Sequence, residues 1–261
     1  MNAESMPLPA VTDRETWRTL SAANLASQWE HPPRTTGGRW ERWDAVWAAD
    51  VASPVAFPNS ATPLRPLSEE NAGGLAADLS QFYAQASGGA WMLWSAWPTP
   101  DLASYGMRLA GYPPLMVRPP APFSAAATGL RIIEAHDEPA LRDFDEAMIR
   151  GYPIPELAFP ADRITDERVL GGPMRYFVGY EDGRPVACAA TYVGVREVGV
   201  YMVATLPEAR GKGYGAAMTA SAIAATPNLP AVLQASDLGQ PVYRRLGFQD
   251  ISSYTLWYKP R

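Results

Sequence analysis

The chain has 261 residues, which suits one large domain or two small ones, and its 47% hydrophobic content can support a substantial core. A formal net charge of −5 and the lack of any basic block argue against nucleic-acid binding. The single cysteine excludes an internal disulfide, and the two histidines join no cluster with metal-ligand spacing. No apolar run is long enough to span a bilayer. We therefore expect a cytoplasmic protein without metal or membrane association.

Two helices are predicted near the start of the chain. The first runs from Asp13, its N-cap, to about Glu30, and His31-Pro32-Pro33 is expected to end it. Trp40, Trp43 and Trp47 have the i, i+3, i+7 spacing of one helical face. Such a face could form an aromatic ligand platform, but an amphipathic helix packed on a core is the favoured interpretation.

The composition changes near the middle of the chain. Pro119-Pro120-Ala121-Pro122 is followed by small and polar residues, so residues 123–129 are the expected linker. Eight of the nine tryptophans precede this segment. We therefore expect an N-terminal domain over residues 1–122 and a second domain over residues 130–261.

The second half has a regular alternation of predicted strands and helices. In chain order these are a strand at 130–133, a helix at 137–150, strands at 174–180 and 185–193, a strand at about 197–206, a helix from about 213 that ends before Pro227, a strand at 231–235, a helix at 238–246 and a final strand or hairpin at 248–259. Asp182-Gly183 predicts a tight hairpin between the second and third strands, because both residues tolerate positive φ.

The most informative segment is the turn Arg210-Gly211-Lys212-Gly213-Tyr214-Gly215, which joins a strand to a helix of small residues. Such a turn directs several backbone N–H groups of a helix N-terminus toward one point, where a pyrophosphate can bind. A P-loop is excluded because Lys212 is followed by glycine and not by Ser or Thr. A dinucleotide fingerprint is excluded because the glycines alternate and the next strand ends without an acidic residue.

This segment resembles the loop of the GNAT superfamily of N-acetyltransferases, Arg/Gln-x-x-Gly-x-Gly/Ala, through Arg210, Gly213 and Gly215. A second family signature, Tyr-x-x-x-Gly-Phe, follows in the right order at residues 243–248. Many members carry Asn seven residues before that tyrosine, where this chain has the shorter Ser236. The resemblance covers about residues 130–261. It implies an α/β (α+β) GNAT fold, with a mixed, mostly antiparallel sheet flanked by helices, and acetyl-CoA as the cofactor without a metal.

The resemblance also implies how acetyl-CoA would be held. Glycines in the turn let backbone N–H groups approach phosphate oxygens, while Lys212 could contact phosphate or remain solvated. The end of the preceding strand would pair with the pantetheine amides, and a backbone N–H there could stabilise the oxyanion. The expected cofactor-binding residues are Val203, Ala204, Thr205, Arg210, Gly211, Lys212, Gly213, Tyr214, Gly215 and Ser236.

Two candidate catalytic residues follow from the resemblance. The Tyr243 hydroxyl would lie near the cofactor sulfur and protonate or hydrogen-bond the leaving thiolate, although a core tyrosine is the alternative. Glu197 is the only acidic residue on the strand before the turn, and strand alternation predicts that it shares a face with Thr205. It could remove a proton from the acceptor amine or be a solvated strand end.

Other residues receive weaker assignments. Tyr201 and Glu156 are the expected acceptor contacts, with core packing and solvent exposure as the respective alternatives. Cys188 stands mid-strand among alanines, and direct transfer needs no enzyme nucleophile, so a buried small hydrophobic residue is expected there.

The first half contains a faint copy of the second at an offset of 141 residues. The aligned pairs are Gly106-Met107 with Gly247-Phe248, Leu115 with Leu256, Arg118 with Lys259 and Leu102 with Tyr243. Because Asn71-Ala72-Gly73-Gly74 lacks the arginine and the alternate glycines, we expect a GNAT-like tandem whose first copy has lost cofactor binding. An unrelated α+β extension is the alternative.

The expected function is therefore direct transfer of the acetyl group from acetyl-CoA to a primary amine, on a small molecule or a peptide, in a ternary complex. A non-catalytic acyl-CoA-binding sensor or regulatory module is one alternative. An acyltransferase that uses a longer acyl-CoA is another. The sequence does not predict the acceptor or the oligomeric state.

Overall fold

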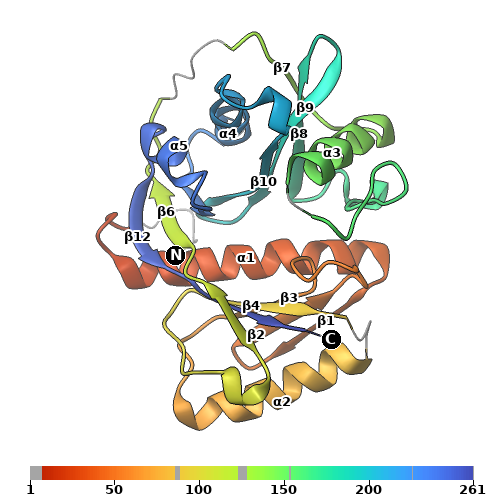
Figure 1. Ribbon diagram of the computed structural model, residues 1–261. Coiled ribbons are helices and arrows are strands. Elements are labelled where there is room, and N and C mark those ends of the chain that lie inside the picture. Colours follow the sequence, from red (N-terminus) through yellow and green to blue (C-terminus); the bar gives the residue numbers. More distant parts are fainter. Residues whose placement is uncertain (1–7, 86–88, 123–127, 153, 225, 261) are drawn as a thin grey trace. The chain divides into compact units, whose positions relative to one another are not determined.

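A computed structural model describes residues 8–85, 89–122, 128–152, 154–224 and 226–260, and Figure 1 shows their helices and strands. These residues form five α-helices, which are α1 (Arg14–Thr36), α2 (Glu69–Gln85), α3 (Glu138–Gly151), α4 (Tyr214–Ala224) and α5 (Gln240–Arg245). The strands are β1 (Arg39–Trp43), β2 (Val46–Asp50), β3 (Ser60–Pro63), β4 (Trp91–Ser95), β5 (Arg108–Gly111), β6 (Pro114–Arg118), β7 (Arg131–Glu134), β8 (Met174–Glu181), β9 (Arg184–Val193), β10 (Val198–Thr205), β11 (Ala231–Gln234), β12 (Gln249–Ser253) and β13 (Thr255–Lys259). Short 3-10 helices include η2 (Ala103–Tyr105), η3 (Glu167–Val169) and η4 (Pro207–Ala209).

The strands of the described segments form two sheets. One has six strands in the order β1-β2-β3-β4-β13-β5, and the other has seven in the order β12-β6-β11-β10-β9-β8-β7. Both are mixed, because β3 pairs with β4 and β10 pairs with β11 in parallel, whereas β1–β2 and β8–β9 are among the antiparallel pairs. The predicted fold class, mixed sheets flanked by helices, is confirmed.

The chain divides into two compact units, one formed mainly by Met116–Leu233 with Asp237–Gln249 and the other mainly by Pro9–Leu115 with Asp250–Arg261. We call them the seven-stranded and six-stranded units after their sheets. Strand β6 belongs to the first half of the sequence but to the seven-stranded sheet, and β13 belongs to the second half but to the six-stranded sheet. The expected linker falls largely on residues 123–127, which lie outside the described residues, so the division at 123–129 stays a prediction.

In the seven-stranded unit, α3 and α4 cover opposite faces of the sheet (Figure 1). Helix α3 begins as predicted, with the Asp137 side chain accepting a hydrogen bond from the Ala140 N–H at 2.9 Å. Its Phe144 packs edge-on against Tyr176 of β8. The predicted hairpin between β8 and β9 is also present, with positive φ at both Asp182 and Gly183.

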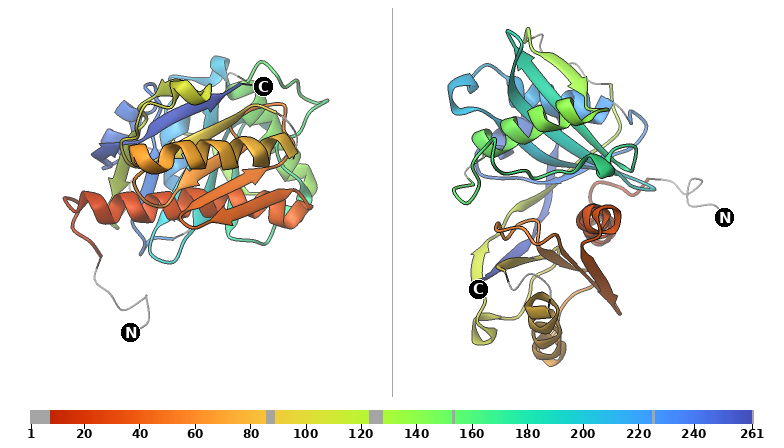
Figure 2. Two further views of the ribbon diagram at one scale, coloured as in Figure 1. Left: turned by 90° about the horizontal axis from the view of Figure 1, so that it is seen from below. Right: turned by 90° about the vertical axis from the view of Figure 1, so that its right-hand side faces the viewer.

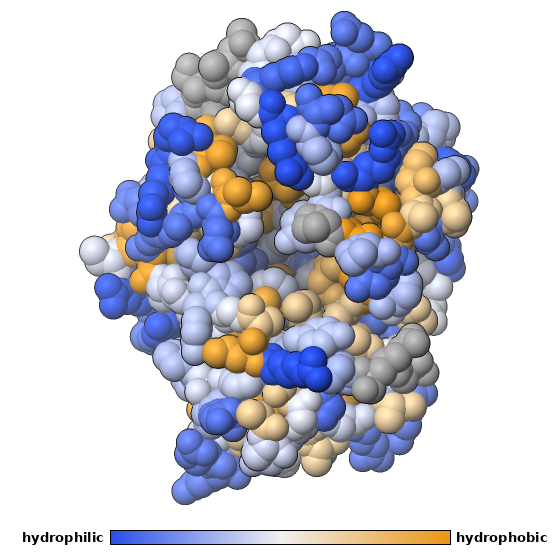
Figure 3. Space-filling view, viewed as in Figure 1, coloured by the Kyte–Doolittle hydropathy of each residue, from blue (hydrophilic) through white to orange (hydrophobic). Residues whose placement is uncertain are grey.

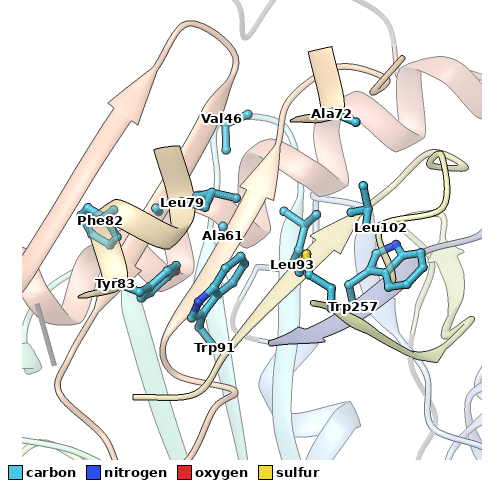
Figure 4. Close-up of a cluster of buried hydrophobic side chains, with 12 residues drawn as sticks. Val46, Ala61, Ala72, Leu79, Phe82, Tyr83, Trp91, Leu93, Leu102 and Trp257 are labelled. Atoms are coloured by element: carbon cyan, nitrogen blue, oxygen red, sulfur yellow. The ribbon is translucent and has the colours of Figure 1, made fainter. Parts of the chain in front are cut away.

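In the six-stranded unit, α1 and α2 lie on opposite faces of the sheet (Figure 2). Helix α2 contributes one side of a buried hydrophobic cluster in which Tyr83 stacks on Trp91 with ring centroids 4.6 Å apart (Figure 4). Burial of such aromatic side chains accounts for much of the hydrophobic stabilisation of a unit this size. Trp257 of β13 belongs to the same cluster.

The predicted helix through Trp40, Trp43 and Trp47 is wrong. These residues lie on β1 and β2, which form an antiparallel hairpin through Asp44 at φ 41°. The three tryptophans do not share one face. Trp47 is paired with Arg42, two residues from Trp40, so Trp40 and Trp47 lie on one face of the hairpin and Trp43 lies on the other, where it packs on Phe82. A helical spacing over only eight residues is too short to establish a helix, and the strand preference of tryptophan and valine, together with tertiary packing, decides for the hairpin.

The expected end of the first helix at His31-Pro32-Pro33 is also wrong. The Asp13 N-cap is confirmed, but α1 continues through both prolines to Thr36 and ends at Gly37, which has φ 87° and donates to the Pro33 carbonyl. Each proline lacks an N–H for the helix and its ring crowds the carbonyl four residues earlier, but the chain remains helical, and the Gly37 N–H bonds to the Pro33 carbonyl. The left-handed glycine is the true stop signal.

No helix in the described segments is long and apolar enough to cross a membrane. On the face shown in Figure 3, apolar residues are interspersed with polar ones.

Candidate functional site

The glycine-rich turn lies at the N-terminus of α4, as predicted. Strand β10 ends at Thr205, η4 follows, and Gly211 and Gly213 both have left-handed φ values, 79° and 80°. The Ala217 N–H bonds to the Gly213 carbonyl, which makes Gly213 the residue where the helix starts. The N–H groups of the first turn have no acceptor within the helix, so the turn can present them to an anion. A Cβ on Gly213 would find space, and its positive φ is therefore what requires glycine.

Arg210 links the turn to two other elements. Its guanidinium donates to the Gly151 carbonyl at 2.9 Å and to the Thr205 carbonyl at 3.2 Å. Gly151, the last residue of α3, packs so closely on β10 that a Cβ there would lie 3.2 Å from the Cβ of Ala204. The arginine therefore holds the ends of α3 and β10 together beside the turn, while its expected contact with cofactor stays a prediction.

Lys212 and Tyr214 share an acidic partner that sequence reasoning missed. Lys212 forms an ion pair of 2.7 Å with Glu181 of β8, and the Tyr214 hydroxyl donates to the same carboxylate oxygen. The hydrogen bonds from Lys212 and Tyr214 lower the pKa of Glu181, and they raise the pKa of both partners. Lys212 is thus oriented by a neighbour rather than merely solvated.

Strand β10 carries a bulge at the expected pantetheine-binding residues. Its register with β9 shifts by one residue between Tyr201 and Ala204, and Met202 has φ 51°. Among its described residues, β10 pairs with β11 at Val198 and Gly199 only. Beyond that point the β11 side of the strand, including Val203, Ala204 and Thr205, is where an extended ligand could pair with the backbone.

The bulge overturns the predicted face of Glu197. One extra residue reverses the alternation, so Ala204, and not Thr205, shares a face with Glu197 and Tyr201. Glu197 is buried, stands just before β10, and accepts a backbone hydrogen bond from Gly194. Its assignment as a base is not tested by this geometry and stays a prediction.

Tyr243 lies on α5 and is half-buried. Its ring packs against Phe248 with centroids 5.7 Å apart, and its carbonyl accepts from the Phe248 N–H, so the two ends of the second signature are in contact. Burial raises the pKa of Tyr243 to about 12, and the neighbouring Tyr152 adds to the effect. The hydroxyl therefore carries its proton at neutral pH.

The remaining candidates are dispersed. Tyr201 is buried. Glu156 is exposed in the segment after α3, four residues along the chain from Tyr152, which is 43% exposed. Ser236 is exposed just beyond β11 but falls in the other compact unit, so its place in the site stays a prediction. Cys188 is buried, as expected, and burial raises the pKa of its thiol.

Two partners of the turn were missed by sequence reasoning because they come from distant segments. Glu181 precedes the predicted hairpin turn, and nothing local in that segment signals a role for it. The one available signal for Gly151 is glycine at the end of a helix.

Residues 172–250 match the family model of an acetyltransferase (GNAT) domain, a span that includes the glycine-rich turn and Tyr243. No curated protein matches the chain. Among solved structures, the chain is similar to a GCN5-related N-acetyltransferase from Kribbella flavida, with 19% identity, a TM-score of 0.65, and 94% of this chain and 96% of that chain covered. A GNAT-family protein from Novosphingobium aromaticivorans has 19% identity and a TM-score of 0.58, with 97% and 100% covered. A GCN5-related N-acetyltransferase-like protein from Streptococcus suis has 16% identity and a TM-score of 0.53, with 94% and 99% covered.

At these identities the structural similarity concerns the fold. Residues 172–250 are therefore similar to a GNAT acetyltransferase domain, and nearly the whole length of the chain shares its fold with GNAT structures.

Proposed function

We propose that the chain is an N-acetyltransferase that uses acetyl-CoA and acts by direct transfer to a primary amine in a ternary complex. One observation carries the proposal: the glycine-rich turn at the start of α4 follows, after η4, a bulged strand whose pairing with β11 stops at Gly199. The turn suits a pyrophosphate, and the strand edge beyond Gly199 suits the two amides of a pantetheine arm. Acetyl-CoA fits both features.

Acetyl-CoA would supply a thioester whose carbonyl carbon bonds to the amine nitrogen as its C–S bond breaks. In this proposal, N–H groups of residues 211–215 hold the pyrophosphate, and a backbone N–H of Val203–Thr205 stabilises the negative charge that develops on the carbonyl oxygen. Tyr243 donates a hydrogen bond to the departing sulfur.

The acceptor must reach this site as a neutral amine. An alkyl amine with a pKa of about 10 is mostly protonated at pH 7, so a group of the protein or a water chain must take a proton. We assign this step to Glu197, which is buried just before β10, and acceptor contacts to Tyr201 and Glu156.

Calorimetry with CoA and a thiol-release assay with acetyl-CoA and a panel of amines test the proposal. The unaltered protein should bind CoA and release thiol with at least one amine. Gly213→Asp, which places a carboxylate at a left-handed position of the turn, should weaken CoA binding by about tenfold or more. Gly74→Asp is the matched control, since Gly74 is exposed on α2 with open space around it, and should leave binding unchanged.

Equal CoA affinity in both glycine variants, or no CoA binding by the unaltered protein, would refute the cofactor site. CoA binding without transfer to any amine would point instead to a non-catalytic acyl-CoA-binding module. Thiol release only from longer acyl-CoA would change the acyl group assigned.

A further inference from the structure

The last strand of each half of the sequence lies in the sheet of the other half. Only residues 112 and 113 separate β5 from β6, yet β6 lies between β12 and β11. Only Tyr254 separates β12 from β13, yet β13 lies between β4 and β5. The bounds of β6 and β13 differ by 141 residues at both ends, which is the offset of the sequence repeat. The exchange is therefore reciprocal.

Each exchanged strand ends in a cation that binds the end of a helix. Arg118 of β6 donates from Nε to the Leu246 carbonyl at 2.9 Å, directly after α5. Lys259 of β13 donates from Nζ to the Tyr105 carbonyl at 2.6 Å, at the end of η2. The two cations align in the repeat, and so do the two carbonyl residues. The chain thus makes the same contact twice, once in each unit.

Only one of these helices carries a candidate catalytic group. Helix α5 bears Tyr243, three residues before Leu246, whereas the aligned residue beside η2 is the buried Leu102. Helix α5 has six residues, too few to be stable without tertiary contacts. Arg118 is 6% exposed, so it provides such a contact from a fixed position.

The surroundings of Arg118 hold its guanidinium in place. Its terminal nitrogens donate to the carbonyls of Pro119, Ala121 and Pro122 at 3.0–3.3 Å. Nε lies 3.7 Å from where a Cβ on Gly247 would stand, at the left-handed end of α5. A cation bound to the last carbonyls of a helix is also favourable toward the helix dipole.

We propose that Arg118 is a positioning residue for acetyl transfer, which fixes the end of α5 and thereby the Tyr243 hydroxyl. This inference rests on the proposed function for its catalytic part. It gives the first half a role that needs no ligand of its own: the first half contributes strand β6 to the sheet of the candidate site and holds its catalytic helix.

The repeat provides a matched control, because Lys259→Met removes the equivalent contact from a helix without the tyrosine. Arg118→Met should lower kcat about fivefold with the KM for acetyl-CoA within about twofold, whereas Lys259→Met should leave kcat unchanged. Arg118→Lys should recover most of kcat, since Lys259 shows that a lysine can make this contact. In the Tyr243→Phe background, Arg118→Met should cause little further loss, because both changes act through the same hydroxyl.

Hydrogen exchange supplies a readout that does not depend on turnover. In the free protein, Arg118→Met should speed amide exchange in residues 240–248, and Lys259→Met should not. Unchanged exchange in α5 would overturn the positioning role even if the protein proved not to be an acetyltransferase. Equal losses of kcat in Arg118→Met and Lys259→Met would also overturn the positioning role, and so would a double variant in which the losses from Arg118→Met and Tyr243→Phe are additive. Absence of any transfer by the unaltered protein would refute the proposed function alone.

Discussion

Tyr243 is the residue whose chemistry the structure defines most closely. Its pKa is raised to about 12, chiefly by burial. A thiolate whose conjugate acid has a pKa of about 8.5 is a much weaker base than this phenolate, so the proton remains mainly on the tyrosine. In the proposed mechanism, Tyr243 would therefore donate a hydrogen bond to the departing sulfur rather than transfer its proton completely, because the hydroxyl stays neutral throughout the working pH range.

Replacing Tyr243 with Phe should therefore lower kcat about tenfold and leave CoA affinity within about twofold. The pH dependence of kcat between pH 6 and 10 should keep its shape, because a group with a pKa near 12 stays protonated below pH 11. Steady-state kinetics and calorimetry measure these effects. Tyr258→Phe, on β13, is the control and should change neither quantity.

A turnover equal to that of the unaltered protein would remove Tyr243 from the mechanism. Loss of a pKa between 6 and 10 from the profile of Tyr243→Phe would instead show that the hydroxyl titrates in that range, contrary to its burial.

Among single residues, those grouped in one local signature could be predicted from the sequence, and their partners could not. Gly213 requires a left-handed φ at a strand-to-helix turn, and that requirement is visible in the spacing of the glycines. Glu181 and Gly151 reach the same turn through tertiary packing alone. Strand alternation places Glu197 on the same face as Thr205, which is wrong, because alternation assumes a strand without a bulge.

At the level of elements, the second half was more predictable than the first. Strands β8 and β9 and the intervening turn are local, so residue preferences decide them. Hairpin β1–β2 is not predicted because its three tryptophans have a helical spacing, although they lie on both faces of the hairpin. The β10 bulge depends on Met202 at φ 51°, a conformation that methionine rarely adopts and that no sequence pattern signals.

The bulge should therefore be sensitive to the residue at position 202. Met202→Ile introduces a β-branched side chain where φ is positive, which should lower the free energy of unfolding by about 1–2 kcal/mol. Relaxation of the bulge would also realign the strand edge proposed to bind pantetheine, so CoA binding should weaken. Urea denaturation and calorimetry measure the two effects.

Val193→Ile is the control for Met202→Ile, since Val193 lies half-buried on the neighbouring strand β9 and has no positive φ. Unchanged stability and unchanged CoA binding in Met202→Ile would show that the bulge does not depend on this residue.

For the whole molecule, the repeat was visible in the sequence but the exchange of strands was not. Strands β5 and β12 recur near the same offset as β6 and β13, which supports two GNAT-like halves, as do the nearly full-length structural similarities. Short apolar strands such as β6 and β13 carry no local mark of the sheet that they join. Their pairing follows from tertiary packing, so the sequence alone would place each strand in its own half.

The exchange should make the two units unfold together. Strands β12 and β13 belong to different sheets and are joined only through Tyr254, which is fully buried and bonds to Ser21 at 2.7 Å. When one sheet opens, the other therefore loses an inner or an edge strand.

All nine tryptophans lie in the six-stranded unit, and the single cysteine, Cys188, is buried in the seven-stranded unit. In urea, tryptophan fluorescence and Cys188 labelling should therefore report free energies of unfolding that agree within about 1 kcal/mol. Trp257→Ala, which removes a buried side chain of β13, should lower both values together by about 3 kcal/mol. Labelling of Cys188 at urea concentrations where the fluorescence is still native, or a Trp257→Ala effect confined to fluorescence, would show that the units unfold independently despite the exchanged strands.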